Sequence, residues 1–250
     1  MSRLRLKDIH TDAPKKFQKE KTKSETIKIK IRLEELQNLM YAEGKHALLI
    51  ILQGMDASGK DGVLRNVFDV VNPMGCRAIA FKAPSELEMK HDFLWRVHQH
   101  VPEKGVIHVF NRSHYEDVLI QRVHEWVDEK TIKQRFHHIN NFEKLLCESG
   151  THVLKFYLHI SKEEQLQRLN ERLSDRTKMW KYNKADLKER DYWDHYMKAY
   201  EDVFANCSES VDWDIIPADQ NWYKEYLIAK KIVDTLESLN MKFPGYKKGK

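Results

Sequence analysis

A glycine-rich stretch near the start of the chain has the residue types that bind phosphate. The pattern G-x-x-x-x-G-K occurs at Gly54-Met55-Asp56-Ala57-Ser58-Gly59-Lys60. The apolar run 47–52 precedes it, as in a strand buried on both faces, and a periodic helical pattern follows it. Glycines let the backbone turn its amides inward, the helix start adds positive potential, and lysine supplies a cation. This context favours a phosphate site over a glycine turn that binds nothing; its predicted residues are Gly54, Ala57, Ser58, Gly59, Lys60, Asp61 and Gly62.

Two carboxylates distinguish this loop from an ordinary phosphate loop. Most such loops have Ser or Thr after the lysine, with a hydroxyl that binds magnesium, whereas this chain has Asp61. Asp56 lies inside the loop. Because anions repel a triphosphate unless a metal ion lies between them, the loop predicts unusual metal handling, or phosphates bound in a different register. A standard GTPase or ATPase is disfavoured.

A second cluster of chemically active residues follows the apolar run 105–110. Arg112 can bind phosphate oxygens with both arms of its guanidinium, and Glu116 and Asp117 can hold magnesium or orient an attacking oxygen. Nucleotide enzymes place such groups beyond the carboxyl end of a central strand. A helix N-terminus capped by Ser113, with acids that complement its dipole, would explain the same pattern, and both interpretations can hold.

A basic segment follows the apolar strand pattern 151–160. Ser161 and Glu164 have capping-box spacing, and residues 168–190 contain eight Lys/Arg against four Asp/Glu. These features predict a helix–loop–helix lid, about 166–190, that grips phosphate. A solvated helix face with i,i+4 ion pairs is the alternative. The candidate phosphate ligands here are Arg168, Arg172, Arg176, Lys178 and Lys181; Lys82, after the strand pattern 76–81, is another.

The composition predicts one globular α/β domain. The 250 residues are 41% hydrophobic and 10% aromatic, and no apolar run approaches the ~20 residues of a membrane span. The chain starts without an apolar signal-like segment, and its three cysteines are far apart, which favours reduced thiols and a cytoplasmic protein. Three histidines, at 91, 98 and 100, have no carboxylate or thiol at ligand spacing, so a metal site there is disfavoured.

Charge is distributed unevenly along the chain. The net charge is +5, but residues 1–30 carry +6 and residues 242–250 carry +4, which leaves the body near −5. Basic ends could serve a polyanion or another subunit, or could only solubilise the chain. The negative body and the lack of a nucleic-acid motif disfavour a nucleic-acid-binding module.

Five apolar strand patterns alternate with helical patterns, and the fifth is at 213–217. This order predicts a three-layer α/β fold of the P-loop kinase type, with a five-stranded parallel sheet, a helical lid and an N-terminal helical extension. We expect three units: an arm and helix at 1–45, the kinase domain at 46–240 and a basic tail at 241–250. We expect an aromatic stripe, at positions 193, 196, 197 and 200, to be core or dimer interface. Helices are expected from Ser24 to Gly44, over about 86–100, from about 118 onward, and over about 128–149, 184–204 and 221–239. Residues 1–24 are expected to form an arm.

Four segments together resemble the polyphosphate kinase 2 family, over about residues 46–220. They are GMDASGK-DG, FKAPSE, FNRSHYEDVL and RLNERLSDRTKMWK. Within that family, Glu116 makes the chain resemble the subgroup that phosphorylates both AMP and ADP, since a subgroup restricted to ADP typically has Asn at this position. The lid departs from a common form at Arg176, where many members have Pro.

The resemblance implies reversible phosphoryl transfer from inorganic polyphosphate to AMP or ADP, with Mg²⁺ or Mn²⁺ as the cofactor. It implies that Lys60 and the loop amides hold polyphosphate, and that Asp56 and Asp117 organise the metal. It places Glu116 near the AMP acceptor and gives phosphate neutralisation to Arg112, Arg168 and Arg172. It also implies adenine or guanine nucleotides as partners, a homo-oligomer (dimer or tetramer), and no nucleic acid or membrane. The alternative is an ATP-dependent kinase similar to thymidylate kinase, which shares G-x-D-x-x-G-K; Asp61 counts against it.

Overall fold

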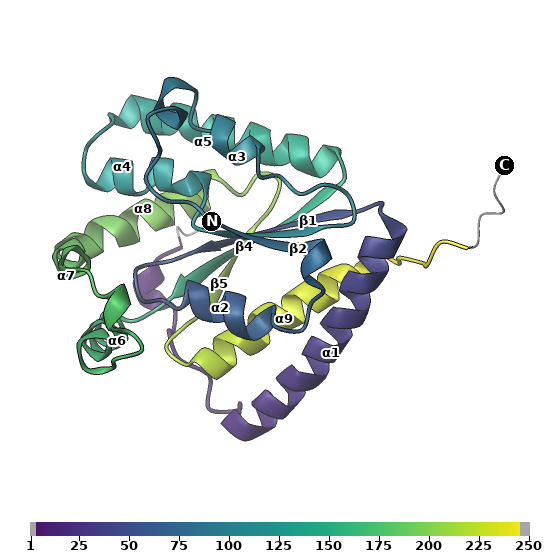
Figure 1. The fold of residues 1–250 in the computed structure, drawn as a ribbon. Coiled ribbons are helices and arrows are strands. Elements are labelled where there is room, and N and C mark those ends of the chain that lie inside the picture. Colours follow the sequence, from purple (N-terminus) through teal and green to yellow (C-terminus); the bar gives the residue numbers. More distant parts are fainter. Residues whose placement is uncertain (1–3, 246–250) are drawn as a thin grey trace.

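The computed structural model describes residues 4–245, which form a three-layer α/β fold. One parallel sheet has the strand order β2-β3-β1-β4-β5. In Figure 1, α1, α2 and α9 cover one face of the sheet, and α3, α4, α5 and α8 cover the other. The strands are β1 (Ala47–Gln53), β2 (Cys76–Ala80), β3 (Ile107–Asn111), β4 (Thr151–His159) and β5 (Trp213–Pro217).

The helices differ widely in length. They are α1 (Lys19–Glu43), α2 (Lys60–Val67), α3 (Trp95–His98), α4 (Ile120–Val123), α5 (Glu129–Glu148), α6 (Lys162–Ser174), α7 (Lys184–Glu189), α8 (Trp193–Asn206) and α9 (Asn221–Ser238). Short 3₁₀ helices are η1 (Leu6–Asp8), η2 (Pro73–Gly75), η3 (Glu88–Lys90), η4 (His114–Val118), η5 (Met179–Lys181) and η6 (Arg190–Tyr192). None of the described helices is both long and apolar enough to cross a membrane.

The central strand determines where the functional loops meet. All seven residues of β1 are buried, as its unbroken apolar sequence predicts for a strand covered on both faces. It pairs in parallel with β3 and β4, so that Leu52 lies opposite Asn111 and Gln53 opposite Tyr157. The loops after β1 and β3 therefore leave the same edge of the sheet, side by side, as the sequence predicted.

Three predicted helices need correction. The helix expected over 86–100 is reduced to η3 and α3, because the chain is extended at His91 and the Asp92 carboxylate accepts from Leu94 N (3.0 Å), which starts a new turn. The helix expected over 184–204 is divided by η6, and the helix expected from 118 consists of only four residues, α4.

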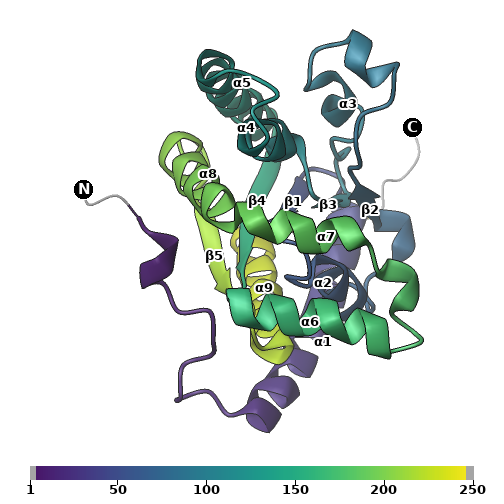
Figure 2. The same ribbon diagram turned by 90° about the vertical axis from the view of Figure 1, so that its left-hand side faces the viewer.

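The predicted arm at 1–24 also differs from the expectation. α1 begins at Lys19 rather than after Ser24, whose hydroxyl instead donates to Glu20 O within the helix. Leu6 is buried, and Thr11 Oγ1 donates to Asp219 Oδ2 (2.7 Å). The segment before α1 is therefore docked on the body beside β5 and α9 (Figure 2).

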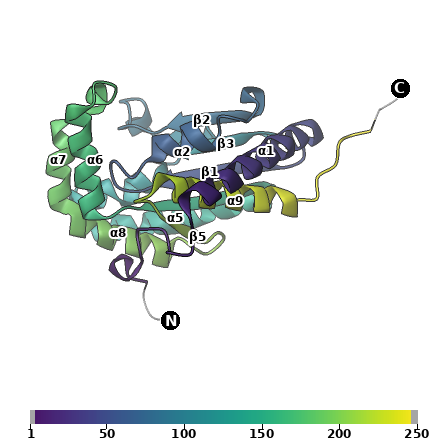
Figure 3. The ribbon, with the colours of Figure 1, turned by 90° about the horizontal axis from the view of Figure 1, so that it is seen from below.

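The other end of α1 agrees with the sequence. The helix ends at Gly44, which has φ +65°, a conformation that glycine adopts without strain. Its length lies against α9 on one face of the sheet (Figure 3). Residues 1–3 and 246–250, which include three of the four lysines in the predicted basic tail, lie outside the described residues.

Most of the aromatic stripe on α8 belongs to the core. Trp193, Tyr196 and Tyr200 are at most 9% exposed, and Met197 packs against the same cluster. The cysteine thiols are free, as predicted; Cys207 is buried and the other two are half-buried.

Candidate active site

Two glycines permit the course of the loop between β1 and α2. Gly54 has φ +149°, and a Cβ there would lie 2.8 Å from the backbone oxygen of Leu158. Gly59 has φ +95°, and a Cβ there would overlap Nζ of Lys224. Gly54 therefore excludes a side chain sterically as well as through its backbone angle, whereas Gly59 disfavours one mainly through its backbone angle. Gly62 lies in the first turn of α2.

Lys60 lies against the loop that it follows. Its Nζ donates to Gly54 O (2.6 Å) and Met55 O (3.1 Å), and the residue is only 8% exposed. Burial, and then repulsion by Arg112, lowers the pKa of Lys60 to about 8, although nearby carboxylates oppose this shift. The two carbonyl oxygens attract the ammonium less strongly than charged phosphate oxygens do, so a bound phosphate would compete with them for Lys60.

Arg112 joins the two predicted clusters. Its Nη2 lies 2.6 Å from Asp56 Oδ1, and its Nη1 lies 3.2 Å from Glu116 Oε2. The charge of Glu116, followed by that of Asp56, raises the pKa of Arg112 against the effect of burial. Arg112 has φ +64°, a sparsely populated conformation for a non-glycine residue, which is a feature of functional sites. The structure thus brings together Asp56, Arg112 and Glu116, three of the predicted catalytic residues, beside Lys60.

Gln53, which sequence reasoning missed, holds Glu116 in place. In the amide orientation that satisfies both of its ends, the Gln53 nitrogen donates to Glu116 Oε1 (3.1 Å). Its oxygen then accepts from Ser113 N (3.2 Å). Ser113 caps η4 by accepting from Tyr115 N, as predicted for a helix start. The only available signal was a polar residue at the end of an otherwise apolar strand.

Asp117 occupies a different environment from Asp56. It is 4% exposed, and its carboxylate accepts from Gln121 and lies 3.6 Å from Arg96 and 3.9 Å from Arg135. Burial raises the pKa of Asp117, and the two arginines oppose that shift. Its Oδ2 has no hydrogen-bond partner among the described residues. Asp117 is thus buried among side-chain cations, and its predicted role as a metal ligand stays a prediction.

Asp61 connects the phosphate loop to the lid. It accepts from Lys181 Nζ (2.7 Å) and from Asn111 Nδ2 (2.8 Å). Burial opposes ionisation, but these two partners hold the pKa of Asp61 below its ordinary value. The residue that replaces Ser or Thr in this loop therefore binds a lid cation.

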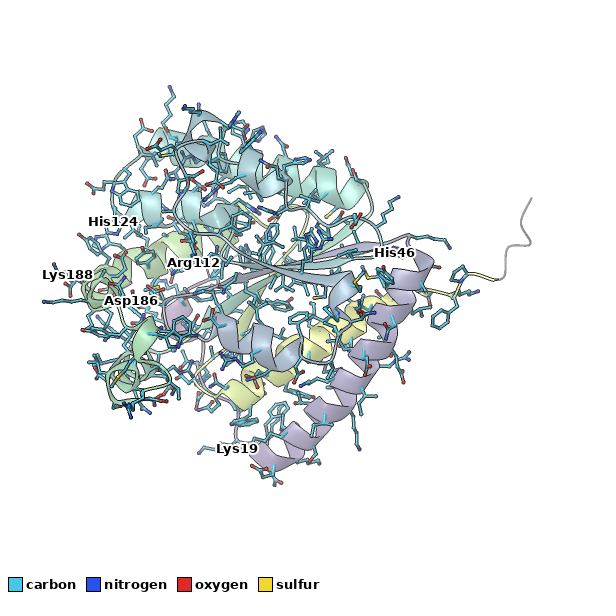
Figure 4. The ribbon with its side chains drawn as sticks, viewed as in Figure 1. Lys19, His46, Arg112, His124, Asp186 and Lys188 are labelled. Atoms are coloured by element: carbon cyan, nitrogen blue, oxygen red, sulfur yellow. The ribbon has the colours of Figure 1, made fainter. Side chains whose placement is uncertain are left out.

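The lid lies across the carboxyl ends of the strands. Figure 2 shows α6 and α7 side by side there. Arg172 Nη1 lies 2.6 Å from Asp186 Oδ2, and burial followed by the charge of Asp56 raises the pKa of Asp186. Figure 4 shows Asp186 and Arg112 at the same end of the molecule, opposite His46. Asp186 is a further acidic residue near the loop that sequence reasoning missed.

Arg168 makes contacts that the sequence did not predict. The sequence assigned it to phosphate neutralisation, but its Nε donates to Glu164 Oε1 (2.7 Å). Its Nη1 donates to Ala57 O and Ser58 O, and its Nη2 to Ala218 O and Asp219 O. These five bonds engage all five guanidinium N–H groups, and phosphate neutralisation by Arg168 stays a prediction.

The remaining predicted cations are not gathered at the loop. The side chains of Lys82 and Arg176 are exposed. Lys178 pairs with Glu171 (3.1 Å) and Asp175 (3.4 Å) within the lid. This arrangement resembles the alternative of a solvated face with local ion pairs, and phosphate binding by these three residues stays a prediction.

The carboxylates fit a metal ion that is shared with a phosphate chain. Among residues 4–245, no group of three or more His, Cys, Asp or Glu could hold a metal by itself. Asp56 and Glu116 are hard oxygen donors beside Lys60, and both face Arg112. Mg²⁺ is usually bound through one or two carboxylates together with substrate phosphates, and Asp56 and Glu116 would supply the carboxylates here.

The sheet order, the phosphate loop after β1 and the helical lid together define a P-loop kinase fold. The family model described as Polyphosphate kinase 2 matches residues 16–244. The chain therefore belongs to the polyphosphate kinase 2 family, as its motifs predicted, and it is a phosphotransferase enzyme of that type.

Similar proteins include two curated relatives. An AMP/ADP-polyphosphate phosphotransferase from Meiothermus ruber is 52% identical over 214 residues, 85% of this chain and 80% of the relative. An ADP-polyphosphate phosphotransferase from Rhodopseudomonas palustris is 45% identical over 226 residues, 85% of this chain and 78% of the relative. The crystal structure of polyphosphate kinase 2 from Arthrobacter aurescens TC1 matches with a TM-score of 0.95 and 40% identity, covering 99% of this chain and 90% of that one.

Proposed function

We propose that this chain transfers the terminal phosphoryl group of inorganic polyphosphate to AMP and ADP, reversibly and with Mg²⁺. The observation that carries the proposal is the Asp56–Arg112–Glu116 cluster beside Lys60. Carboxylates among phosphate-seeking cations suit a metal ion bound between them and a polyanion. The relative named for both AMP and ADP, at 52% identity, supports both acceptors.

Different residues align the substrates and neutralise the charge of the phosphates. The loop amides and Lys60 hold the polyphosphate end, and Arg112 neutralises the transferring group. Glu116, held by Gln53, orients the acceptor phosphate in this proposal. When bound, Mg²⁺ would neutralise charge on the phosphate oxygens, and Asp56 would hold it, with Asp117 as the predicted second ligand.

Several finer features belong to the same proposal. Adenine nucleotides are the expected acceptors and guanine nucleotides the next candidates, with Mn²⁺ able to replace Mg²⁺. We expect a homo-oligomer, a dimer or tetramer, in the cytoplasm, with neither nucleic acid nor membrane as a partner.

A donor screen tests the function. Purified protein is incubated with AMP or ADP, Mg²⁺ or Mn²⁺, and either polyphosphate or ATP as the phosphoryl donor. We expect ADP and ATP to form from polyphosphate. Product from AMP with ATP as the only effective donor would instead establish the nucleoside-monophosphate kinase similar to thymidylate kinase.

Lys60→Ala separates catalysis from folding in this assay. We expect turnover to fall by about 10³-fold or more, because a preorganised charge at the transferring phosphate is lost. The melting temperature should stay close to that of the exposed control Lys130→Ala. A large drop in melting temperature would show that Lys60 is structural.

A further inference from the structure

A second lysine, from the far end of the sequence, lies behind the phosphate loop. Lys224 on α9 is fully buried, and its Nζ donates to Ser58 O (3.2 Å) and Asn221 Oδ1 (2.8 Å). A buried ammonium is costly unless hydrogen bonds compensate for its lost hydration. Lys224 belongs to none of the motifs that identify the family and lies 164 positions after Lys60.

Arg168 reaches the same stretch of backbone from α6. Its Nη1 donates to Ala57 O (3.1 Å) and Ser58 O (3.3 Å). Two cations from different helices thus bind consecutive carbonyls of the loop. Charged donors make stronger bonds than neutral ones, and buried carbonyls need partners, so these contacts fix the loop backbone firmly.

The geometry of the peptide bond converts this anchoring into an effect on the cleft. In a planar trans peptide, the carbonyl and the following N–H point in opposite directions. Holding Ser58 O toward Lys224 and Arg168 therefore directs the Gly59 N–H away from them. That N–H has no acceptor among the described residues, so it remains free for a phosphate oxygen.

Gly59 also makes room for the lysine. A Cβ at this position would overlap Nζ of Lys224, so the second glycine of the motif permits the close approach of the ammonium from behind. Burial, and then the charge of Arg168, lowers the pKa of Lys224 to about 7. The ammonium of Lys224 therefore lies close to other cations at an electrostatic cost. Hydrogen bonds to the loop carbonyls offset that cost.

Lys224 and Arg168 together form an anchor for the phosphate loop, and the other contacts of Arg168 attach this anchor to the rest of the fold. Its Nη2 donates to Ala218 O (2.9 Å) and Asp219 O (2.7 Å), in the segment between β5 and α9. Thr11 and Ser161 both donate to the Asp219 side chain. The anchor is therefore part of a network that joins four separate stretches of the chain.

We propose that Lys224 is a positioning residue, which together with Arg168 holds the carbonyls of the phosphate loop so that its amides face the polyphosphate. The assignment rests on the proposed function for the identity of that anion. Lys224 touches no substrate and acts through the loop backbone.

Lys224→Met and Lys224→Gln test the proposal. Met keeps the length of the side chain without a donor, and Gln restores a neutral donor toward Ser58 O. For polyphosphate, we expect kcat/KM to fall roughly 100-fold in Lys224→Met, since small misplacements of a site cost about that much. Lys224→Gln should recover part of the loss. The melting temperature of Lys224→Met should stay close to that of the wild type, because removing a buried charge offsets the lost bonds and Arg168 still donates to Ser58 O.

The control is Lys230→Met, which removes an exposed lysine from the same helix. It should retain the wild-type kcat/KM. Wild-type kcat/KM in Lys224→Met would overturn the proposal, as would a loss that Lys224→Gln does not reduce and that accompanies a lower melting temperature.

Isothermal titration of the full-length variants with polyphosphate separates this inference from the proposed function. Weaker binding by Lys224→Met than by Lys230→Met supports the inference, and equal binding overturns it. If the wild type neither binds nor uses polyphosphate, the proposed function fails. In that case the two variants are titrated with Mg²⁺–ATP, the donor in the alternative function. Weaker binding by Lys224→Met than by Lys230→Met again supports the inference, and equal binding overturns it.

Discussion

The phosphate loop has cations on two sides, and they differ in the partners that they bind. On the cleft side, Arg112 and Lys181 pair with side-chain carboxylates, those of Asp56, Glu116 and Asp61. Behind the loop, Arg168 and Lys224 bind backbone carbonyls. Carboxylates can turn to bind a metal ion, which would release their arginine or lysine to phosphate, whereas a carbonyl held by the fold cannot.

The comparison explains why charge alone was a poor guide to role. Arg112 and Arg168 each have a carboxylate four residues away and both follow a strand. The partners of the remaining N–H groups differ, because Arg112 pairs with Asp56 whereas Arg168 donates to backbone carbonyls. Among these cations, those on carboxylates suit a site that exchanges ligands, and those on carbonyls behind the loop suit a rigid support. Lys60 also binds carbonyls, and its place in the phosphate motif is what assigns it to the substrate.

The largest expected effect comes from replacing the two arginines in parallel. Arg112→Gln should lower kcat by about 10³-fold, comparable to the loss of an arginine that neutralises a transferring phosphoryl group. Its melting temperature should change little, because the Arg112 ion pairs are partly exposed. Initial rates with polyphosphate and thermal melts of the same samples measure both quantities.

Arg168→Gln should show the other pattern. We expect its unfolding free energy to fall by about 2 kcal/mol, since carbonyls in the interior lose charged donors. Denaturant titration beside Arg65→Gln, an exposed arginine on α2, provides the measurement and its control. Equal stability losses in Arg112→Gln and Arg168→Gln would remove the distinction between the two sides.

The sequence predicted most of the sheet because burial leaves a clear pattern. The strand expected at 47–52 is longer by one residue and fully buried, whereas the edge strand expected at 213–217 has those bounds although it is mostly half-buried. Strands covered on both faces have continuous apolar runs that need no tertiary knowledge. By contrast, a side-chain cap at Asp92 interrupts the helix expected over 86–100, and the burial of Leu6 depends on a distant surface.

The site was predictable where its residues follow strand ends, and not elsewhere. Asp56, Arg112 and Glu116 lie within a few residues of β1 or β3, so strand order alone brings them together. Lys224 is one of several lysines on α9, and only the fold distinguishes it from the exposed Lys230. Only the fold likewise shows that Arg168 faces the loop, because the i,i+4 spacing of Glu164 and Arg168 gives no sign of it in the sequence.

A smaller effect sharpens the comparison within the cleft. Glu116→Asn removes a charge beside Arg112 but keeps a polar side chain. We expect kcat/KM to fall about tenfold for AMP and less than about threefold for ADP, if Glu116 orients the acceptor phosphate of AMP. Steady-state rates with each acceptor measure the ratio, with Glu125→Gln as an exposed control. Equal losses for both acceptors would contradict a role in acceptor choice.

The smallest expected effect concerns the ion pair between the loop and the lid. In Asp61→Asn, Lys181 loses its carboxylate partner and becomes available to the substrate polyanion. We expect the KM for polyphosphate to fall about threefold at low salt, because an exposed pair contributes less than ~1 kcal/mol and is screened by salt. The difference from the wild type should shrink as ionic strength rises. Asp69→Asn, which removes an equal charge paired with Lys30, should leave KM unchanged. A higher KM in Asp61→Asn would mean that Asp61 serves the substrate or its metal ion, and that this carboxylate is more than a partner for the lid.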